Sequence, residues 1–227
     1  TLWANDSTRE SRLMATMVFP VSEFSVDKAK KWIADADTVE LVDMLCFRLV
    51  RNVEGAEQLA FSLVGEEPTR YAGLRLLMNL LAEYLDNRRL RKTPERFAIL
   101  EAVFSHNDHF GIEALYVDME NRAYHVSRST IYNTMELFTE CGLVRKHQFG
   151  TNQAVYEKVV SSGNHHHLIC TECGKVKEVK DQELMDYIGS RRYGTFSVSY
   201  ISLYVYGICS TCQRRRRRNR KIDKKTT

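Results

Sequence analysis

Residues 93–158 decide the fold of the middle of the chain, and they read TPERFAILEAVFSHNDHFGIEALYVDMENRAYHVSRSTIYNTMELFTECGLVRKHQFGTNQAVYEK. Thr93-Pro94-Glu95 supplies an N-cap, a first helical residue and a first-turn acid, so a helix should begin there. Capping residues and hydrophobic periodicity predict three helices in quick order, over 94–105, over 112–121, and from Ser127 or Ser129 to just before Gly142.

A β-hairpin should follow the third helix. Two β-prone runs flank Gly150-Thr151-Asn152, a pattern that predicts a hairpin. Three helices and a hairpin form a winged helix, in which the third helix lies in the major groove of DNA and the hairpin touches the flanking backbone. The sequence therefore predicts double-stranded DNA as a partner.

A small α/β unit is predicted beyond residue 160. The expected elements are strands over 168–171 and 176–179, a helix over 181–192, and a long strand over 196–208, where Ser alternates with large apolar residues for much of its length.

Four cysteines of this unit form two CxxC pairs, Cys170-Thr-Glu-Cys173 and Cys209-Ser-Thr-Cys212. Two CxxC turns present the four thiolates that zinc prefers and leave no coordination position open. The interval between the pairs is long, so the sheet must bring them together. We therefore predict a closed structural zinc site, with two redox-active pairs as the alternative. Cys46 and Cys141 have no partner in the sequence and are expected to be small buried apolar residues.

A histidine triplet, His165-His166-His167, precedes the first CxxC pair. Alternation along an extended segment would place His165 and His167 on one face. Glu157 at the end of the hairpin and His109 between the first two helices could add ligands, and such a mixed nitrogen and oxygen set suits a divalent transition metal. A solvated loop is the alternative. Three other histidines are expected at the surface: His106, His125 and His147.

The first part of the chain, residues 7–85, has helical periodicity throughout and breaks near Pro20, 35–37, 53–55 and 65–68. Short helices joined by tight turns should stack as helical hairpins, with helices expected over 56–64 and 69–85. The polar, basic stretch 86–92 interrupts this periodicity. A domain boundary is therefore expected there.

Composition limits the functional classes. The 227 residues are 44% hydrophobic and 27% charged, as in ordinary globular proteins. No run approaches the roughly 18 apolar residues of a membrane helix, so we expect a cytoplasmic protein without a membrane partner. The net charge is +4, and residues 214–225 concentrate Arg and Lys. Such a terminal block is usually a solvated, disordered tail, and the alternative is a sequence-independent grip on phosphates.

Residues 90–213 resemble the ferric uptake regulator (Fur) family of repressors. The matching stretches are RKTPERFAILEAVF, HFGIEALY, SRSTIYNTMELFTECGLV, YE, HHHLICTECGKVKEV and SLYVYGICSTC. The resemblance implies a homodimeric, metal-gated repressor that binds an operator in double-stranded DNA. It implies neither an enzyme nor a small organic substrate.

The resemblance also implies roles for particular residues. The structural zinc ligands are matched by Cys170, Cys173, Cys209 and Cys212, and the regulatory metal ligands between the two domains by His109, Glu157, His165 and His167, with Glu178 as a further carboxylate. Peroxide-sensing relatives carry Asp where this chain has Glu157, which favours metal sensing. The sensed metal could be Fe²⁺, Zn²⁺ or Mn²⁺, since these share ligand types.

The expected DNA contacts lie on and before the winged helix. They are Ser129, Thr130, Tyr132 and Asn133 on the third helix, and Arg91, Lys92 and Arg96 for phosphates. The family's usual Arg after the tyrosine is Asn133 here, so the operator sequence should differ.

Residues 2–82 resemble a fragment of AlkD-type DNA alkylation repair proteins, which are built from HEAT-like helical hairpins. The stretches are LWANDSTRESRLMATMV, KKWIADADTVELVDMLC and EEPTRYAGLRLLMNLLA. The family's catalytic Asp would fall on Asp43, but the Trp expected four residues before it is Val39. A helical scaffold or a cap that extends the dimer is the alternative to glycosylase activity.

The predicted fold is therefore α+β in four parts: an all-helical HEAT-like segment (1–87), a winged-helix DNA-binding domain (88–160), an α/β zinc-containing dimerisation domain (161–213) and a disordered basic tail (214–227). The leading function is a metal-responsive transcriptional repressor. The rival is a DNA repair protein, acting as an alkylated-base glycosylase, fused to a regulatory domain. A third interpretation makes the zinc unit a pure dimerisation module and the histidine cluster incidental.

Overall fold

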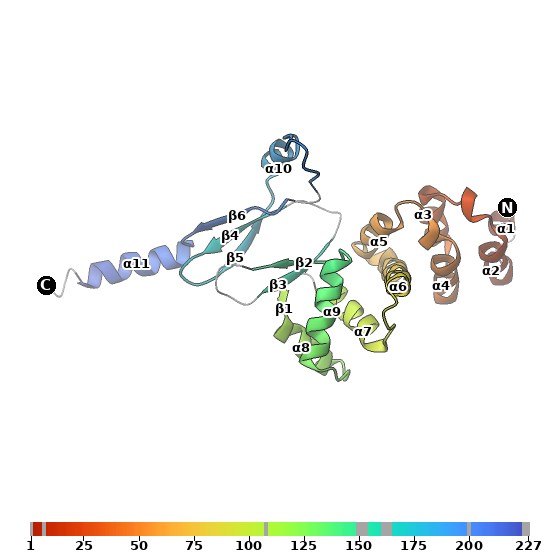
Figure 1. Ribbon diagram of the computed structural model, residues 1–227, viewed down its shortest axis with the longest axis horizontal. Helices are drawn as coiled ribbons and strands as arrows, with labels where there is room; N and C mark the ends of the chain where they lie inside the picture. The colour runs from red at the N-terminus through yellow and green to blue at the C-terminus, as the bar shows by residue number, and fades with distance from the viewer. Residues whose placement is uncertain are drawn as a thin grey trace. The chain divides into compact units, whose positions relative to one another are not determined.

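The computed structural model describes residues 2–5, 8–106, 109–148, 154–159, 165–198 and 201–223 (Figure 1). The chain divides into two compact units. The N-terminal unit comprises Thr1–His147 with Ala154–Ser162, and the C-terminal unit comprises Gln148–Gln153 with Gly163–Thr227. Of the helices that the structure describes, none has both the length and the apolar character needed to cross a membrane.

Six helices open the N-terminal unit: α1 Leu2–Asn5, α2 Arg9–Val18, α3 Val26–Asp35, α4 Val39–Arg48, α5 Ala56–Val64 and α6 Arg70–Asn87. Short 3₁₀ turns at Val21–Glu23, Val50–Asn52 and Glu67–Thr69 join them where the sequence predicts breaks. The hydroxyls of Thr8, Ser25 and Thr38 cap three of these helices by accepting a backbone N–H three residues on. The predicted helix over 56–64 is confirmed, and the one expected over 69–85 extends to Asn87.

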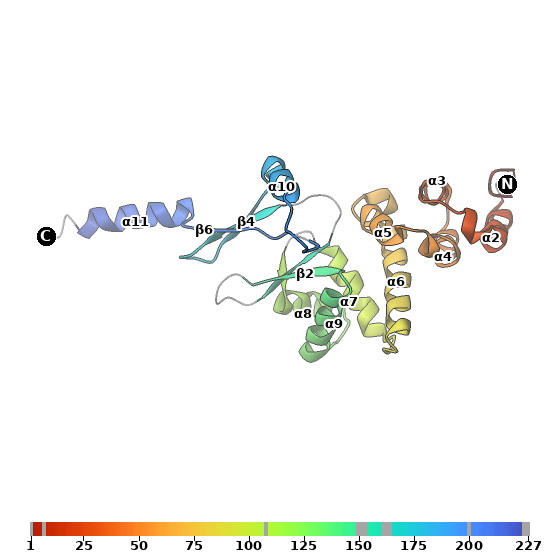
Figure 2. The ribbon, with the colours of Figure 1, turned by 45° about the horizontal axis from the view of Figure 1, so that its top comes forward.

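The winged helix follows, with α7 Pro94–Ser105, α8 Ile112–Asn121 and α9 Arg128–Glu140 gathered beside its sheet (Figure 2). The three helices lie where the sequence predicts them. Strands β1 Phe110–Gly111, β2 Val144–His147 and β3 Val155–Lys158 form an antiparallel sheet in the order β1-β3-β2. The predicted turn residues 150–152 lie outside the described residues. Strand β1 has only two residues, too few for any periodic pattern to reveal it.

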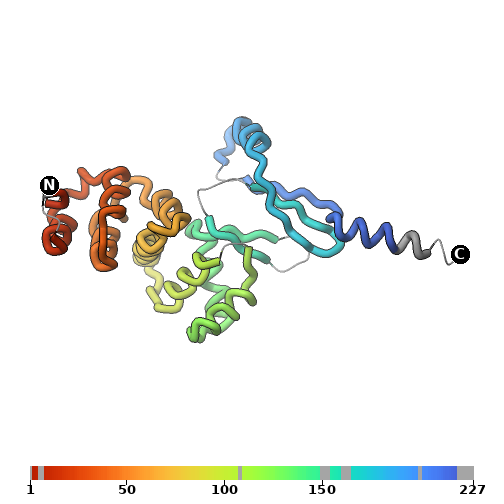
Figure 3. Tube along the Cα trace, turned by 180° about the vertical axis from the view of Figure 1, so that it is seen from behind, coloured from red at the N-terminus to blue at the C-terminus, as the bar shows by residue number. Residues whose placement is uncertain are grey.

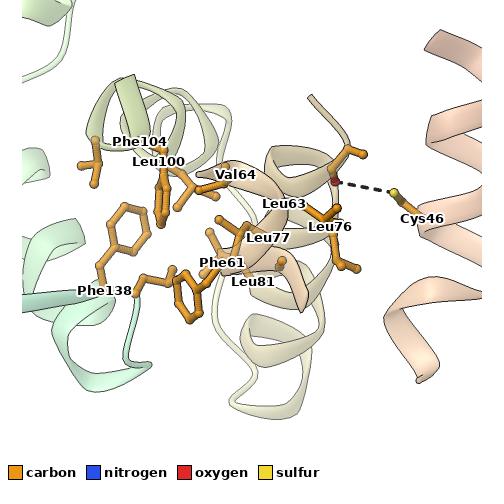
Figure 4. Close-up of a cluster of buried hydrophobic side chains, with 14 of the residues drawn as sticks. Cys46, Phe61, Leu63, Val64, Leu76, Leu77, Leu81, Leu100, Phe104 and Phe138 are labelled. Carbon is orange, nitrogen blue, oxygen red and sulfur yellow. Dashed lines mark hydrogen bonds between the residues drawn. The ribbon is translucent and has the colours of Figure 1, made fainter. Parts of the chain in front are cut away.

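The helical segment and the winged helix share one apolar core (Figure 4). The rings of Phe61 on α5 and Phe104 on α7 stack with centroids 6.3 Å apart. Helices α5 and α6 can approach closely because Gly73 has no side chain. A Cβ at this position would lie 2.4 Å from the backbone nitrogen of Val64. Among the described residues, this buried core continues past residue 87, from α6 into α7.

The C-terminal unit contains β4 His166–Cys170, β5 Val176–Val179, α10 Gln182–Gly189, β6 Tyr204–Gly207 and α11 Ser210–Asp223. Its sheet has the order β5-β4-β6, with β5 antiparallel and β6 parallel to β4. The predicted strand over 196–208 is wrong in extent, because only Tyr204–Gly207 is strand among the residues of this range that the structure describes. Within the described chain β6 pairs with β4 alone, and β4 is short; Phe196, before the paired region, is 74% exposed.

The basic C-terminal residues also differ from the expectation. The sequence predicts a disordered tail from residue 214, whereas α11 runs from Ser210 to Asp223 and continues directly from the end of β6 (Figure 3). The backbone N–H of Gln213 donates to the carbonyl of Cys209 at 2.9 Å, which closes the first turn. Arg, Lys and Gln have high helix propensity, so a helix that has started at the cysteine pair can continue through them.

Candidate metal centres and DNA-binding helix

The sheet of the C-terminal unit brings the two CxxC pairs together. Cys170 ends β4 and lies opposite Gly207 of β6. Because the two strands are parallel, their carboxyl ends lie side by side at the same end of the sheet. Cys209 lies two residues after the end of β6, and Cys212 lies in the first turn of α11. The four cysteines are free thiols with sulfur atoms all within 4.8 Å of one another, and the Sγ atoms of Cys173 and Cys209 are 3.8 Å apart.

Backbone donors favour the thiolate form at this cluster. The N–H of Cys209 donates to Sγ of Cys170 at 3.3 Å and, as the largest cause, lowers the pKa of Cys170 to about 6. The backbone N–H of Cys212 lowers the pKa of Cys209, whereas burial raises the pKa of Cys212. Four converging sulfur atoms, of which at least one is favoured as a thiolate, fit a tetrahedral divalent cation. A site of four cysteines is typical of structural zinc.

A buried carboxylate in the N-terminal unit lies between two imidazoles. Glu157 on β3 is 8% exposed. Its Oε2 is 3.2 Å from Nε2 of His109, and its Oε1 is 3.0 Å from Nε2 of His147. Imidazole and carboxylate groups held this way form a preorganised donor set for a divalent metal.

His147 corrects the sequence prediction, because it is buried and only 2% exposed. Strand register explains its position: Arg145 lies opposite Glu157 in the β2–β3 ladder, and His147 lies two residues further on the same face. Alternation along β2 was the available signal, but it needed the pairing with β3 to become informative. His125 is exposed as predicted, and His106 is half-buried against the ring of Phe110.

The histidine triplet supplies donors in the C-terminal unit. His167 on β4 is 2% exposed and lies opposite Glu178 on β5. The rings of His165 and His167 are 4.8 Å apart, consistent with the alternation that places them on one face. His165 and His167 are therefore neighbouring nitrogen donors, and Glu178 lies on the strand next to His167.

The predicted recognition helix is α9, whose N-cap Ser127 accepts the N–H of Thr130. Ser129, Tyr132 and Asn133 are exposed and follow i, i+3, i+4 spacing, so they occupy one face. The Thr130 hydroxyl is 2.8 Å from Oγ of Ser127 and belongs to the cap. One face of α9 thus presents exposed hydroxyl and amide groups.

The predicted phosphate contacts lie just before α7 and in its first turn. Arg91 and Lys92 are exposed, and Lys92 forms an ion pair with Asp86. The guanidinium of Arg96 donates to the carbonyl of Arg91 at 2.6 Å. This bond fixes the chain entering the winged helix and leaves the side chain of Arg91 exposed.

Asp43, the position predicted for a catalytic carboxylate, is already engaged by two neighbours. Oδ1 of Asp43 accepts a hydrogen bond from the Tyr71 hydroxyl at 2.8 Å and lies 2.7 Å from Nε of Arg75. All three residues lie in α4 and α6, where they tie the two helices together.

Comparison with known proteins gives the family. The ferric uptake regulator family matches residues 87–206, so the N-terminal helical region has no assigned family. A ferric uptake regulation protein of Neisseria meningitidis is 32% identical over 145 residues, which cover 62% of this chain and 97% of the relative. A peroxide-responsive repressor PerR of Staphylococcus saprophyticus is 29% identical over 130 residues, which cover 57% of this chain and 86% of the relative.

A solved structure agrees with this fold. The ferric uptake regulator of Helicobacter pylori aligns with a TM-score of 0.53 at 17% identity and covers 62% of this chain and 94% of its own. Regulators of this family bind DNA operators as dimers, and the His and Glu donors described above fit the family's regulatory metal. The chain belongs to the ferric uptake regulator family and is a metal-responsive transcriptional regulator, not an enzyme.

Proposed function

We propose that this chain is a homodimeric repressor that binds its operator when a divalent metal, Fe²⁺, Zn²⁺ or Mn²⁺, is held by five residues from its two units. The proposed regulatory ligands are His109, Glu157, His165, His167 and Glu178, and the proposed structural zinc ligands are Cys170, Cys173, Cys209 and Cys212. The proposed location is the cytoplasm, where regulators of the family act. The observation that carries the proposal is the buried Glu157 carboxylate held between two imidazoles.

Burial and charge support a metal at these donors. A carboxylate that is 8% exposed is costly unless cations or donors satisfy it. His147 holds Oε1 of Glu157, which leaves Oε2 directed toward His109. Nη1 of Arg145 also lies 3.7 Å from Oε1 of Glu157, and a bound divalent cation would add positive charge beside this carboxylate. His109, Glu157 and His147 then act by holding their donor atoms in place.

The division of the ligands between two units suggests how binding is coupled to DNA. His109 and Glu157 move with α9, whereas His165 and His167 belong to the sheet of the C-terminal unit. Joining the two groups restricts the angle between the units, and in a two-fold dimer that angle sets the separation of the recognition helices. Half-sites one helical turn apart accept one separation. A ligand that binds this state better shifts the population toward it.

Exposed apolar residues support the dimer. Val205 and Tyr206 on β6 are 45% and 54% exposed, and Phe196 is 74% exposed. A second copy covering this region would remove them from water.

The proposed operator contacts are Ser129, Thr130, Tyr132 and Asn133 for bases, with Arg91, Lys92 and Arg96 for phosphates. The exposed face of α9 supports the first group, although the cap engages Thr130. We also favour metal sensing over peroxide sensing, because the carboxylate at position 157 is Glu, while relatives of both kinds match the chain.

The N-terminal segment is proposed to be a scaffold of HEAT-like hairpins that extends the winged helix. Its shared core with α7 supports this role. Glycosylase activity at Asp43 is not favoured, because Arg75 and Tyr71 already neutralise and hold the carboxylate. A base-excision assay on alkylated duplex DNA tests this alternative, and no released base is expected.

The test of the repressor function is metal-dependent DNA binding by His109→Ala. The variant should lose metal-stimulated operator binding while its structural zinc content and dimer mass remain unchanged. His125→Ala is the matched control, since His125 is exposed and pairs only with Glu120 among the described interactions. If His109→Ala binds operator as tightly as the unaltered protein and still responds to added metal, the proposed site is not the switch.

A further inference from the structure

Helix α11 sorts its five consecutive arginines onto different faces. At 100° per residue, Arg214, Arg217 and Arg218 follow i, i+3, i+4 spacing and share an arc of roughly 100°. Arg215 and Arg216 point elsewhere. All five side chains are exposed in the structure. The helix therefore separates the five arginines into two groups, Arg214, Arg217 and Arg218 on one face and Arg215 and Arg216 away from it.

One group is held by an acid inside the cysteine cluster. Glu172 lies between Cys170 and Cys173, and its side chain is 17% exposed. Its carboxylate pairs with the guanidinium of Arg216 and lies 3.9 Å from that of Arg215. The side chain of Arg215 also approaches Sγ of Cys212 at 3.9 Å. These contacts fasten the start of α11 to the turn that carries the first two cysteines.

The other group has no acidic partner. Among the described residues, no carboxylate pairs with Arg214, Arg217 or Arg218, and the Nε of Arg214 donates only to the Ser210 carbonyl. Their Cα atoms span about 6 Å along the helix axis. Phosphates of one DNA strand recur about every 3.4 Å along the duplex axis, so this face can reach two or three of them.

We infer that the Arg214, Arg217 and Arg218 face of α11 is a second, sequence-independent binding surface for the phosphate backbone of duplex DNA, fastened to the cysteine cluster through Glu172. Because a helix already orders the backbone that carries these arginines, binding costs less conformational entropy than it would for a disordered tail. Phosphate contacts add affinity without reading base edges. The inference takes only its ligand, duplex DNA, from the proposed function and does not require operator recognition.

The chemistry of the helix favours duplex DNA over other polyanions. A helix that lies on a membrane needs a broad apolar face, and residues 213–218 are Gln and Arg only. Binding of single strands depends on aromatic side chains for base stacking, and this segment has none. Bare guanidinium groups match the regular backbone of a duplex.

The test compares two variants of the intact chain that lose the same charge. The first replaces Arg214, Arg217 and Arg218 with Gln, which keeps a high helix propensity. The control replaces three exposed cations of the N-terminal unit, Lys30, Lys31 and Arg48, with Gln. Binding to a random-sequence duplex without operator is measured between about 50 and 200 mM salt.

The α11 variant should lose affinity, and the slope of log K against log salt should become shallower by about 0.9 for each phosphate contact removed, up to about 3. The control should keep the slope of the unaltered protein. An unchanged slope in the α11 variant, or equal losses in both variants, would overturn the inference. Larger losses on single-stranded RNA or on phosphatidylserine vesicles than on duplex would also overturn it.

Two further measurements separate the parts of this inference. The preference for operator over random duplex should not change in the α11 variant. Because the main test uses a random duplex, its result can be interpreted even if the unaltered protein does not recognise the operator. Glu172→Gln should reduce amide-exchange protection in the first turns of α11. Unchanged protection there would show that Glu172 does not fasten the helix.

Discussion

The two units bury very different amounts of apolar surface. The N-terminal unit has a continuous core that runs from Trp3 in α1 to Tyr156 in β3. Among the described residues of the C-terminal unit, the buried apolar side chains are Ile169, Cys170, Met185 and Cys212, and two of these four are cysteines of the sulfur cluster. Because so few of its described apolar side chains are buried, we expect metal ligation and association with a second copy to stabilise this unit.

The largest expected effect follows from this difference. Replacing Cys170 and Cys173 with Ser should unfold the C-terminal unit and leave the N-terminal unit folded, because structural zinc supplies on the order of 10 kcal/mol or more to small domains. Region-resolved hydrogen exchange and zinc analysis measure this. Cys141→Ser, at a half-buried thiol outside the cluster, is the control. Retained protection in β4, β5 and β6 of the double variant would contradict the dependence on metal.

A substitution in the apolar core should destabilise the N-terminal unit and leave the C-terminal unit folded. Phe61→Ala removes a ring that stacks on Phe104, and we expect a loss of about 3–5 kcal/mol in the N-terminal unit. Since the helical segment and winged helix share this core, both should unfold in one transition. Phe47→Ala, at a ring 46% exposed, should cost under about 1 kcal/mol. Denaturant titration followed by exchange in α4 and α9 measures both, and separate transitions for the two helices would refute the shared core.

Thiol reactivity should show the smallest effect. Burial raises the pKa of Cys46 to about 12 and that of Cys141 to about 11, so at pH 8 both are almost fully protonated and unreactive. Their alkylation should accelerate as pH rises toward those values, because the thiolate fraction grows. Chelation should expose the four cluster cysteines to alkylation and leave Cys46 and Cys141 unchanged, as mass spectrometry would show. Faster labelling of Cys46 after chelation would mean that the N-terminal unit also depends on metal.

Local signals predicted much of the fold. Thr93-Pro94 and Ser127 mark helix starts that depend on neighbouring residues alone, so α7 and α9 lie at their predicted positions. The cluster of four cysteines was predictable for a similar reason, since CxxC spacing is a property of a single turn. The helical segment's shared core was not, because packing of Phe61 on Phe104 joins residues that are distant in the chain.

Strand pairing accounts for the other differences. The burial of His147 depends on the β2–β3 register, and the shortness of β6 depends on the length of β4. Helix α11 was missed because composition alone predicts a solvated tail, whereas its first turn starts at the Cys209–Cys212 pair and is held by Glu172. In each case the missing information was a partner far away in sequence.

The metal switch is tested most directly by calorimetric titration of Mn²⁺ into zinc-loaded protein. The titration is done with and without an operator duplex that has been selected in the presence of metal. Linkage requires that operator tightens metal binding by the same factor by which metal tightens operator binding, and a tenfold factor corresponds to about 1.4 kcal/mol. We predict equal factors for the unaltered protein and no coupling for His109→Ala. Identical Mn²⁺ affinity with and without operator, in protein that binds operator, would contradict a metal-gated repressor.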